Sequence, residues 1–354
     1  MSRSSPLFEL YLSRLREFYR QPARIFWVYG FPTVLAVGLG LAFRSGRTET
    51  VQVDLVRNAG VAPVETALKL YSQSRSKDKP ALLLREAPPD EALRRLTTGK
   101  TPLVVEAESG GKVRYHYDPT RPEAVTARGL IDDILQESAG RKNPTPTEDV
   151  LVTEKGSRYI DFLIPGLIGL NTMGGGLWGI GFLLVNFRIA KLLKCFVATP
   201  MPRRDFLMAL LGARLTFLIP DLTVLLLLGT LAFEMPLRGS LILVVAIDVL
   251  GALAFAGIGL LIASRAQSTE TVSGLMNLVM LPMWLLSGVF FSSERFPAAA
   301  QPVIQALPLT QLISALRRVI LEGAGWFDVY PAMLILALWA FLSFALALRI
   351  FRWT

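Results

Sequence analysis

The stretch SLILVVAIDVLGALAFAGIGLLIA, from Ser240 to Ala263, contains a single charged residue, Asp248. A helix needs about 20 predominantly apolar residues to cross the hydrocarbon core of a bilayer, and this stretch is long enough. Similar blocks recur along a chain that is 52% hydrophobic. We therefore expect a polytopic, mainly α-helical membrane protein with six spans at Ile25–Phe43, Tyr159–Phe187, Phe206–Phe233, Ser240–Ala263, Val272–Phe291 and Val329–Phe351.

The first block, Ile25–Phe43, could instead be the apolar core of a cleaved signal peptide. Its basic leader is long, however, and no clear small-x-small cleavage site follows it. These two features favour a permanent span at residues 25–43.

Charge is distributed unevenly over the chain. Between Ser45 and Ser157 there are 17 Lys/Arg and 17 Asp/Glu, so the net charge of +9 belongs to the membrane part. Basic residues cluster before the first span, after the second and fourth, and at the end of the chain. By the positive-inside rule, both termini face the cytoplasm of a cell (inner or plasma) membrane and residues 44–158 lie outside. The basic total is thus a topology signal and does not indicate nucleic-acid binding.

Residues 44–158 are expected to form an inserted α/β extracytoplasmic domain between the first two spans. Alternating apolar residues predict strands at TVQVDLV (50–56) and PALLLREA (80–87), and a Gly-Gly turn between PLVVEAE (102–108) and KVRYHYD (112–118) predicts a hairpin. Helical spacing predicts helices at residues 62–73, 88–99 and 122–136.

Three features of the chain resemble reactive sites without completing one. The TTGKT segment has Arg94 where a phosphate-binding loop needs glycine, so we expect a helix end and a turn there. His116, the single histidine, has no His/Cys cluster around it, and we expect a strand residue and no metal. Cys195 is the single cysteine and is expected to be a small apolar filler at the cytoplasmic face. No catalytic residue is predicted.

The N-terminal segment, residues 1–24, is expected to be an amphipathic helix that Pro22 ends before the first span. A helix of this kind lies in the headgroup plane, with its aromatic face towards lipid. A solvated cytoplasmic helix is the alternative, but it would leave the aromatic stripe exposed. The predicted elbow helix carries three arginines: Arg14, Arg16 and Arg20.

The segment from residue 188 to 206 repeats this design after the second span. Ile189, Leu192, Leu193 and Phe196 share one face, and prolines at positions 200 and 202 predict a stiff turn into the next helix. Asp205 is a plausible N-cap for that helix. Because this turn is stiff, a force applied to the segment would be transmitted to the membrane helices with little loss.

Two motifs at this point resemble the permease subunits of ABC type-2 exporters. FVATPMPRRDFLMAL (196–210) is similar to the family's cytoplasmic coupling segment, and WLLSGVFFSSERFPAAAQPVIQALPLTQLISALRRVI (284–320) is similar to the region after the fifth span. The second motif includes Pro308, Leu309, Thr310 and Arg317 as an outer gate or signature. The large insert between the first two spans also resembles a subset of this family.

The resemblance implies a six-span half-transporter that pairs with a second, identical or homologous half. It also implies a separate cytoplasmic ATPase subunit that binds ATP and Mg²⁺, whereas this chain, which has no Walker motif, carries no cofactor. The expected ATPase-coupling residues are Arg188, Lys191, Lys194, Ala198, Thr199, Pro200, Pro202, Arg203, Arg204 and Asp205.

Charged residues also lie inside the predicted spans. Arg214 and Asp221 are seven residues apart, which places them on one helix face, and Asp248 lies in the next span. Such residues mark either a polar conduit or gate, or structural ion pairs between helices. The glycine-rich NTMGGGLWGIG (171–181) predicts close helix contact, within the protomer or with a second half. Residues 292–328 are expected to form short re-entrant or interfacial helices.

These features together predict an exporter permease that moves an amphiphilic, drug-like or lipidic substrate outward. One alternative is a non-transporting assembly that transmits ATPase strokes to the extracytoplasmic domain. A secondary transporter or ion channel lacks support, because neither an inverted repeat nor a charged pore ring is visible.

Overall fold

The chain divides into two compact units in the computed structural model: a membrane unit (Met1–Arg44 with Val152–Thr354) and an α/β unit (Ser45–Leu151). The structure describes residues 6–42, 50–57, 61–74, 80–108, 112–141, 156, 158–198 and 202–351. Each unit has its own buried apolar core.

Five helices among the described residues are long and apolar enough to cross a membrane, and a bent helix pair raises the number to six if it counts as one span. The chain is therefore a multi-pass membrane protein. The five are Pro22–Ala42, Tyr159–Ile189, Arg204–Ala232, Leu241–Ala263 and Trp326–Ile350.

Several of these spans combine α-helical and π-helical segments. The membrane unit contains α1 (Pro6–Tyr19), α2 (Pro22–Ile25), a π-helical turn (Phe26–Gly30), α3 (Phe31–Ala42), α7 (Tyr159–Gly176), a π-helical turn (Leu177–Phe182), α8 (Leu183–Ile189), α9 (Leu192–Val197), α10 (Arg203–Leu227) with a π-helical end (Leu228–Ala232), α11 (Leu241–Ala263), α12 (Thr269–Leu286), α13 (Gln301–Ala306), α14 (Pro308–Arg317) with a π-helical end (Arg318–Glu322), and α15 (Trp326–Ile350).

Helix α11 lies at the centre of the membrane unit, where it packs against α7, α14 and α15. A helix that is apolar on all sides is buried, and α11 has hardly any polar face. Gly176 permits a close approach between α7 and α11, because a Cβ there would lie 2.5 Å from Cβ of Phe255. Gly181 similarly lies against the carbonyl of Gly259. Glycines of the predicted contact segment are thus used within the protomer.

The predicted fifth span, Val272–Phe291, differs from the structure. Helix α12 covers Thr269–Leu286 and is not among the five apolar spans. It ends at Ser287, and Gly288 follows with a positive φ of 78°, a conformation that stops a helix readily. The predicted short helices at residues 292–328 are confirmed as helices, and the pair Ala298–Ala306 and Pro308–Glu322 is bent by 88°.

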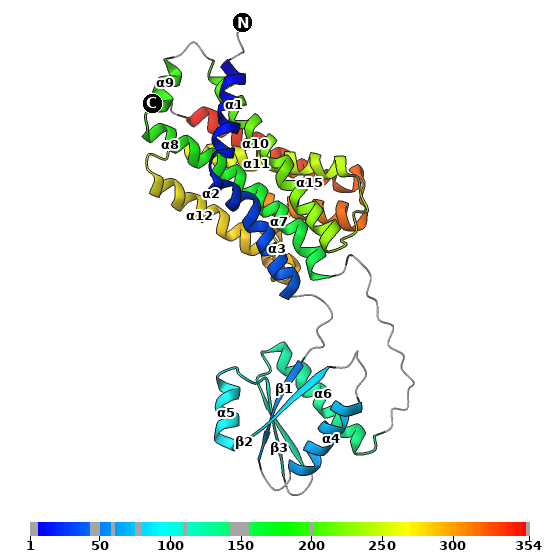
Figure 1. Cartoon of the computed structure of the whole chain (residues 1–354). Helices are drawn as coiled ribbons and strands as arrows, with labels where there is room; N and C mark the ends of the chain where they lie inside the picture. Colours follow the sequence, from blue (N-terminus) through cyan, green and yellow to red (C-terminus); the bar gives the residue numbers. More distant parts are fainter. Residues whose placement is uncertain are drawn as a thin grey trace. The chain divides into compact units, whose positions relative to one another are not determined.

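The α/β unit contains the predicted strands and helices: β1 (Thr50–Val56), α4 (Val61–Ser74), β2 (Ala81–Ala87), α5 (Pro89–Thr97), β3 (Leu103–Ala107), β4 (Val113–Tyr117) and α6 (Pro122–Ser138). The sheet order is β2-β1-β3-β4, with β1 parallel to β2 and β3, and β3 antiparallel to β4. Helix α5 lies on one side of the sheet, and α4 and α6 lie on the other (Figure 1).

Alternate residues of the sheet face two apolar layers. Leu55 of β1 packs with Leu68 of α4 and Ile131 of α6, whereas Val56 packs with Ala92 of α5 on the other face. This alternation is what the period of two in a strand dictates.

The TTGKT segment is a helix end and turn as predicted, since α5 ends at Thr97 and Gly99 has a φ of 71°. His116 lies on β4 and its Nε2 is 3.1 Å from Oε2 of Glu106. The described residues contain no group of three His, Cys, Asp or Glu side chains that could hold a metal ion.

Candidate functional site

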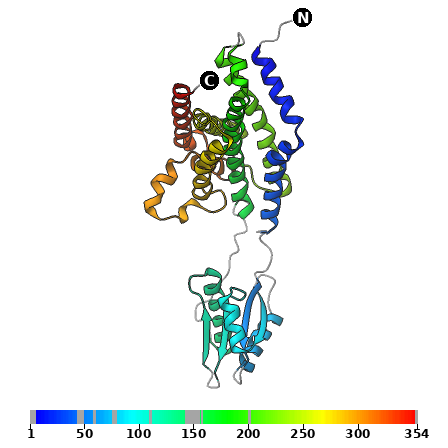
Figure 2. The same cartoon turned by 90° about the vertical axis from the view of Figure 1, so that its left-hand side faces the viewer.

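The elbow helix α1 packs along α10, as Figures 1 and 2 both show. The hydroxyls of Tyr11 and Thr216 are 2.8 Å apart, and the ring of Phe18 stacks on Phe217 with centroids 4.1 Å apart. Part of the aromatic face predicted to meet lipid therefore contacts protein, while Phe8 and Tyr19 are about half exposed.

Of the three elbow arginines, Arg16 and Arg20 are exposed and Arg14 is not. Arg14 forms a 2.6 Å ion pair with Glu17, and its guanidinium lies 4.6 Å from the ring centre of Phe187. Burial lowers the pKa of Arg14, against the opposing charge of Glu17. Arg14 thus joins the elbow to α8.

The predicted coupling segment, residues 188–206, contains the end of α8, a tight turn, α9 and the start of α10. Lys191 adopts a positive φ of 57° at the turn, and Leu193 anchors α9 by its buried side chain. Lys191, Lys194, Cys195 and Ala198 are exposed. Thr199 and Pro200 lie outside the described residues.

Pro202 is the N-cap residue of α10, which begins at Arg203. The prediction of Asp205 as N-cap is wrong: Asp205 lies in the first turn, where a negative charge favours the helix dipole. Arg204 is 85% exposed and its Nε is 3.5 Å from Oδ1 of Asp205.

Arg188 has a different environment from the other cations of this segment. Its guanidinium donates hydrogen bonds to the carbonyls of Ala263 (2.7 Å), Ala266 (2.5 Å) and Ser264 (3.3 Å), at the end of α11. The last carbonyls of a helix have no intrahelical donor, so Arg188 supplies one. These bonds give Arg188 an anchoring role, because they tie the coupling segment to the end of the central helix α11. Its predicted ATPase contact stays a prediction.

The buried polar residues of the spans meet around α7. The side-chain amide of Asn171 donates to Oδ1 of Asp221 (2.5 Å) and to the backbone carbonyl of Val28 (3.0 Å). The backbone carbonyl of Asn171 accepts a hydrogen bond from Arg214 (3.4 Å). No ion pair within 4.0 Å joins Arg214 to Asp221 or Asp248 in the described part of the chain. Asn171 therefore bridges Arg214 and Asp221 through hydrogen bonds.

Asp248 is held separately. Thr172 donates a 2.6 Å hydrogen bond to its Oδ1, and both side chains are buried. Sequence reasoning missed Asn171 and Thr172 as polar partners. A sequence signal for this role was present: Asn171 and Thr172 are adjacent polar residues in an otherwise apolar span, and the next two spans carry charged residues that need polar partners.

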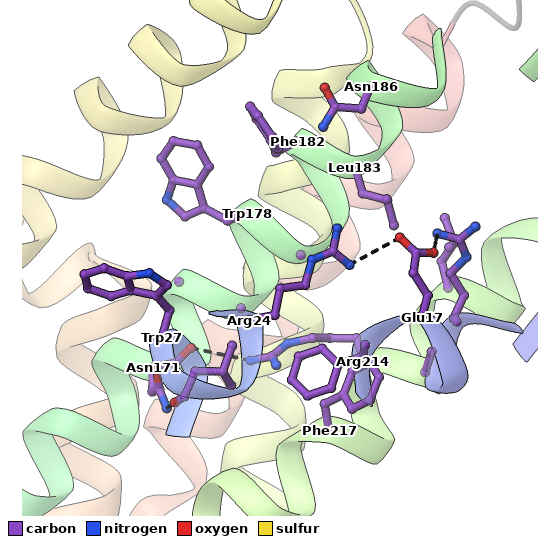
Figure 3. A pocket seen from close by; sticks show the side chains of 18 residues that line it. Glu17, Arg24, Trp27, Asn171, Trp178, Phe182, Leu183, Asn186, Arg214 and Phe217 are labelled. Atoms are coloured by element: carbon purple, nitrogen blue, oxygen red, sulfur yellow. Dashed lines mark hydrogen bonds and ion pairs between the residues drawn. The ribbon is translucent and has the colours of Figure 1, made fainter. Parts of the chain in front are cut away.

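A cavity of about 460 Å³ lies between the elbow, the start of the first span, α7–α8 and α10 (Figure 3). Aromatic side chains and guanidinium groups line it together. Gly175 makes room for Arg214 at its wall, because a Cβ there would collide with the guanidinium. No sequence pattern indicated a cavity here.

The family model of the ABC-2 family transporter protein matches residues 23–349. The chain belongs to this family. Its curated relatives include ABC transporter G family member 20 of Dictyostelium discoideum (28% identity over 56% of this chain and 27% of the relative) and the inner membrane transport permease YhhJ of Escherichia coli (31%, over 34% and 32%). A third is the probable multidrug ABC transporter permease YbhR of Escherichia coli (24%, over 59% and 58%). The chain thus matches between about a quarter and three fifths of the length of these relatives.

In this ABC-2 family chain, the predicted outer signature is a packing element. Pro308, Leu309 and Thr310 are buried at the start of α14. Arg317 donates to the carbonyls of Phe162 (3.0 Å) and Gly288 (2.6 Å), and its guanidinium lies 3.4 Å from the ring centre of Phe162. These contacts hold α14 against α7 and the end of α12.

Proposed function

We propose that the chain is the permease subunit of an ABC exporter, driven by ATP and Mg²⁺ on a separate cytoplasmic ATPase subunit. Two permease halves, identical or homologous, would form the working unit, and the substrate would move outward at their interface. The observation that carries this proposal is family membership over residues 23–349, together with relatives whose names describe transport permeases.

The coupling segment supports a contact with the ATPase. Lys191, Lys194 and Arg204 are exposed cations on a short stretch of chain, which favours a partner with an acidic surface. Arg188 connects the same stretch to α11, so a displacement of the segment would be passed to the centre of the membrane unit. We assign these three exposed cations to ATPase recognition.

An amphiphilic, drug-like or lipidic substrate fits the apolar surface of the outer helices. Phe327, Phe341 and Leu348 of α15 are more than half exposed, as side chains at lipid or at a second half would be. The relative YbhR is described as a probable multidrug permease. This supports a substrate that reaches the transporter from the bilayer.

A second function is favoured by the α/β unit, which has its own core between the sheet and two helices. In that alternative, ATPase strokes would move this unit, outside the membrane, to act on other envelope proteins without transport. ATP-dependent movement of an amphiphilic dye in sealed vesicles separates the two functions.

The test uses the ATPase that co-purifies with the chain from native membranes. We expect Lys194→Glu with Arg204→Glu to lower the ATPase activity of the reconstituted complex, and dye export with it, by about tenfold, as loss of one or two charge contacts does. Arg295→Glu, an exposed arginine at the opposite end of the predicted topology, is the control. Full coupling in the doubly reversed variant contradicts the proposal.

A further inference from the structure

The cavity beside the elbow helix is lined by residues of this one chain, and none of its described lining residues lies in the coupling segment 188–206. Its volume of about 460 Å³ lies within the range of about 300–1,000 Å³ typical of small-molecule sites. Its wall comes from three parts of the chain that are distant in sequence, residues 14–28, 171–186 and 210–217, so the fold itself builds it (Figure 3).

Charge on the lining is unbalanced. Arg14, Arg24 and Arg214 line the cavity, and Glu17 is the one carboxylate among the described lining residues. Glu17 lies between two of the arginines, 2.6 Å from Arg14 and 3.3 Å from Arg24. The lining therefore carries two positive charges more than negative ones.

Arg214 is the buried member of this set. Its side chain is 7% exposed, its Nε is buried with no hydrogen-bond partner among the described residues, and its one hydrogen bond, to the carbonyl of Asn171, is long at 3.4 Å. A buried guanidinium with spare donors is costly unless an acceptor meets it. A ligand anion in the cavity would be such an acceptor.

The rest of the lining suits an apolar body. Trp27, Trp178, Phe182 and Phe217 line the cavity from three parts of the chain, as Figure 3 shows. Gly174 adds open space, because a Cβ built there meets nothing within 4 Å. The site thus combines an anion-binding end with an aromatic wall.

We propose that this cavity binds an amphiphile with a negatively charged head, whose carboxylate or phosphate meets Arg24 and Arg214 and whose chain lies along the two tryptophans. This inference concerns binding by the chain itself and does not depend on the exporter function. It is tested without an ATPase subunit, so failure of one proposal leaves the other standing.

The test measures binding of a dansyl-labelled long-chain carboxylate to the purified full chain in a neutral detergent, by energy transfer from tryptophan. The uncharged amide of the same probe measures how much of the binding affinity comes from apolar contacts alone. We expect the carboxylate to bind at least about tenfold more tightly than the amide, and Arg24→Gln to remove this difference.

A matched pair of glycine variants tests the location. Gly174→Leu fills the cavity and should abolish saturable binding of the carboxylate. Gly38→Leu, in α3 and outside the lining, has equally open space around its Cβ and should bind as the unaltered chain does. Equal affinity for carboxylate and amide, or undiminished binding by Gly174→Leu, overturns the proposal.

Competition identifies the source of the ligand. Displacement of the probe by phosphatidylglycerol and not by phosphatidylcholine supports a bilayer lipid as occupant. Displacement by a soluble anionic detergent alone supports a substrate-like amphiphile at the same anion site. Displacement by phosphatidylcholine at least as strong as by phosphatidylglycerol contradicts an anion-selective site.

Discussion

The anchoring role of Arg188 makes a prediction that distinguishes a loss of thermal stability from a loss of ATPase coupling. Arg188→Met keeps an unbranched apolar stem, although a shorter one, and removes the donors to the carbonyls of Ala263, Ser264 and Ala266. All three acceptor residues are at most 3% exposed, so water replaces the lost donors poorly. Each hydrogen bond from a charged donor contributes about 1.5–3 kcal/mol, and the two short bonds therefore represent about 3–6 kcal/mol.

Such a loss should lower the apparent melting temperature of the detergent-solubilised chain by at least about 6 °C, at about 2–4 °C per kcal/mol. Arg204→Met is the matched control, because Arg204 is 85% exposed and its replacement should change stability by no more than about 0.5 kcal/mol. We expect this control to lower ATPase coupling instead. Melting temperatures of the two variants within about 2 °C of each other would refute the anchoring role.

Three further predictions concern packing and domain structure. Gly176→Ala should destabilise the chain by about 1–3 kcal/mol through overlap with α11, whereas Gly174→Ala should leave thermal stability unchanged or raise it by up to about 1 kcal/mol. Asn171→Leu should lower the melting temperature clearly, because it leaves the buried carboxylate of Asp221 without its amide donor; an unchanged melting temperature would contradict the bridging role. The α/β unit (Ser45–Leu151) produced alone should unfold cooperatively in urea, monitored by circular dichroism, and a broad, featureless transition would show that it depends on the membrane unit.

Much of the fold followed from local pattern. Long apolar blocks predicted the five apolar spans within a few residues, and alternation and turn residues predicted every strand of the α/β unit. The fifth predicted span was less accurate, since α12 starts with polar residues and Gly288 ends the helical region before Phe291. Hydropathy alone does not predict where a helix such as α12 ends.

The site was less predictable, because its contacts join residues far apart in sequence. Arg188 meets Ala263 across 75 positions, and Arg317 meets Phe162 across 155. Sequence pattern showed that these arginines lie near span ends but not which carbonyls accept from them. Asn171 was overlooked for the same reason, since its role depends on the side chain of Asp221 in another helix.

The central claim is that a separate ATPase works on the cytoplasmic coupling segment, and Cys195 offers the most direct test. It is the single cysteine of the chain and its side chain is exposed on α9. In membrane vesicles of known orientation, a membrane-impermeant maleimide should label Cys195 from the cytoplasmic side, and bound ATPase subunit should protect it. Labelling from the outer side, or equal labelling with and without the ATPase bound, would contradict the account.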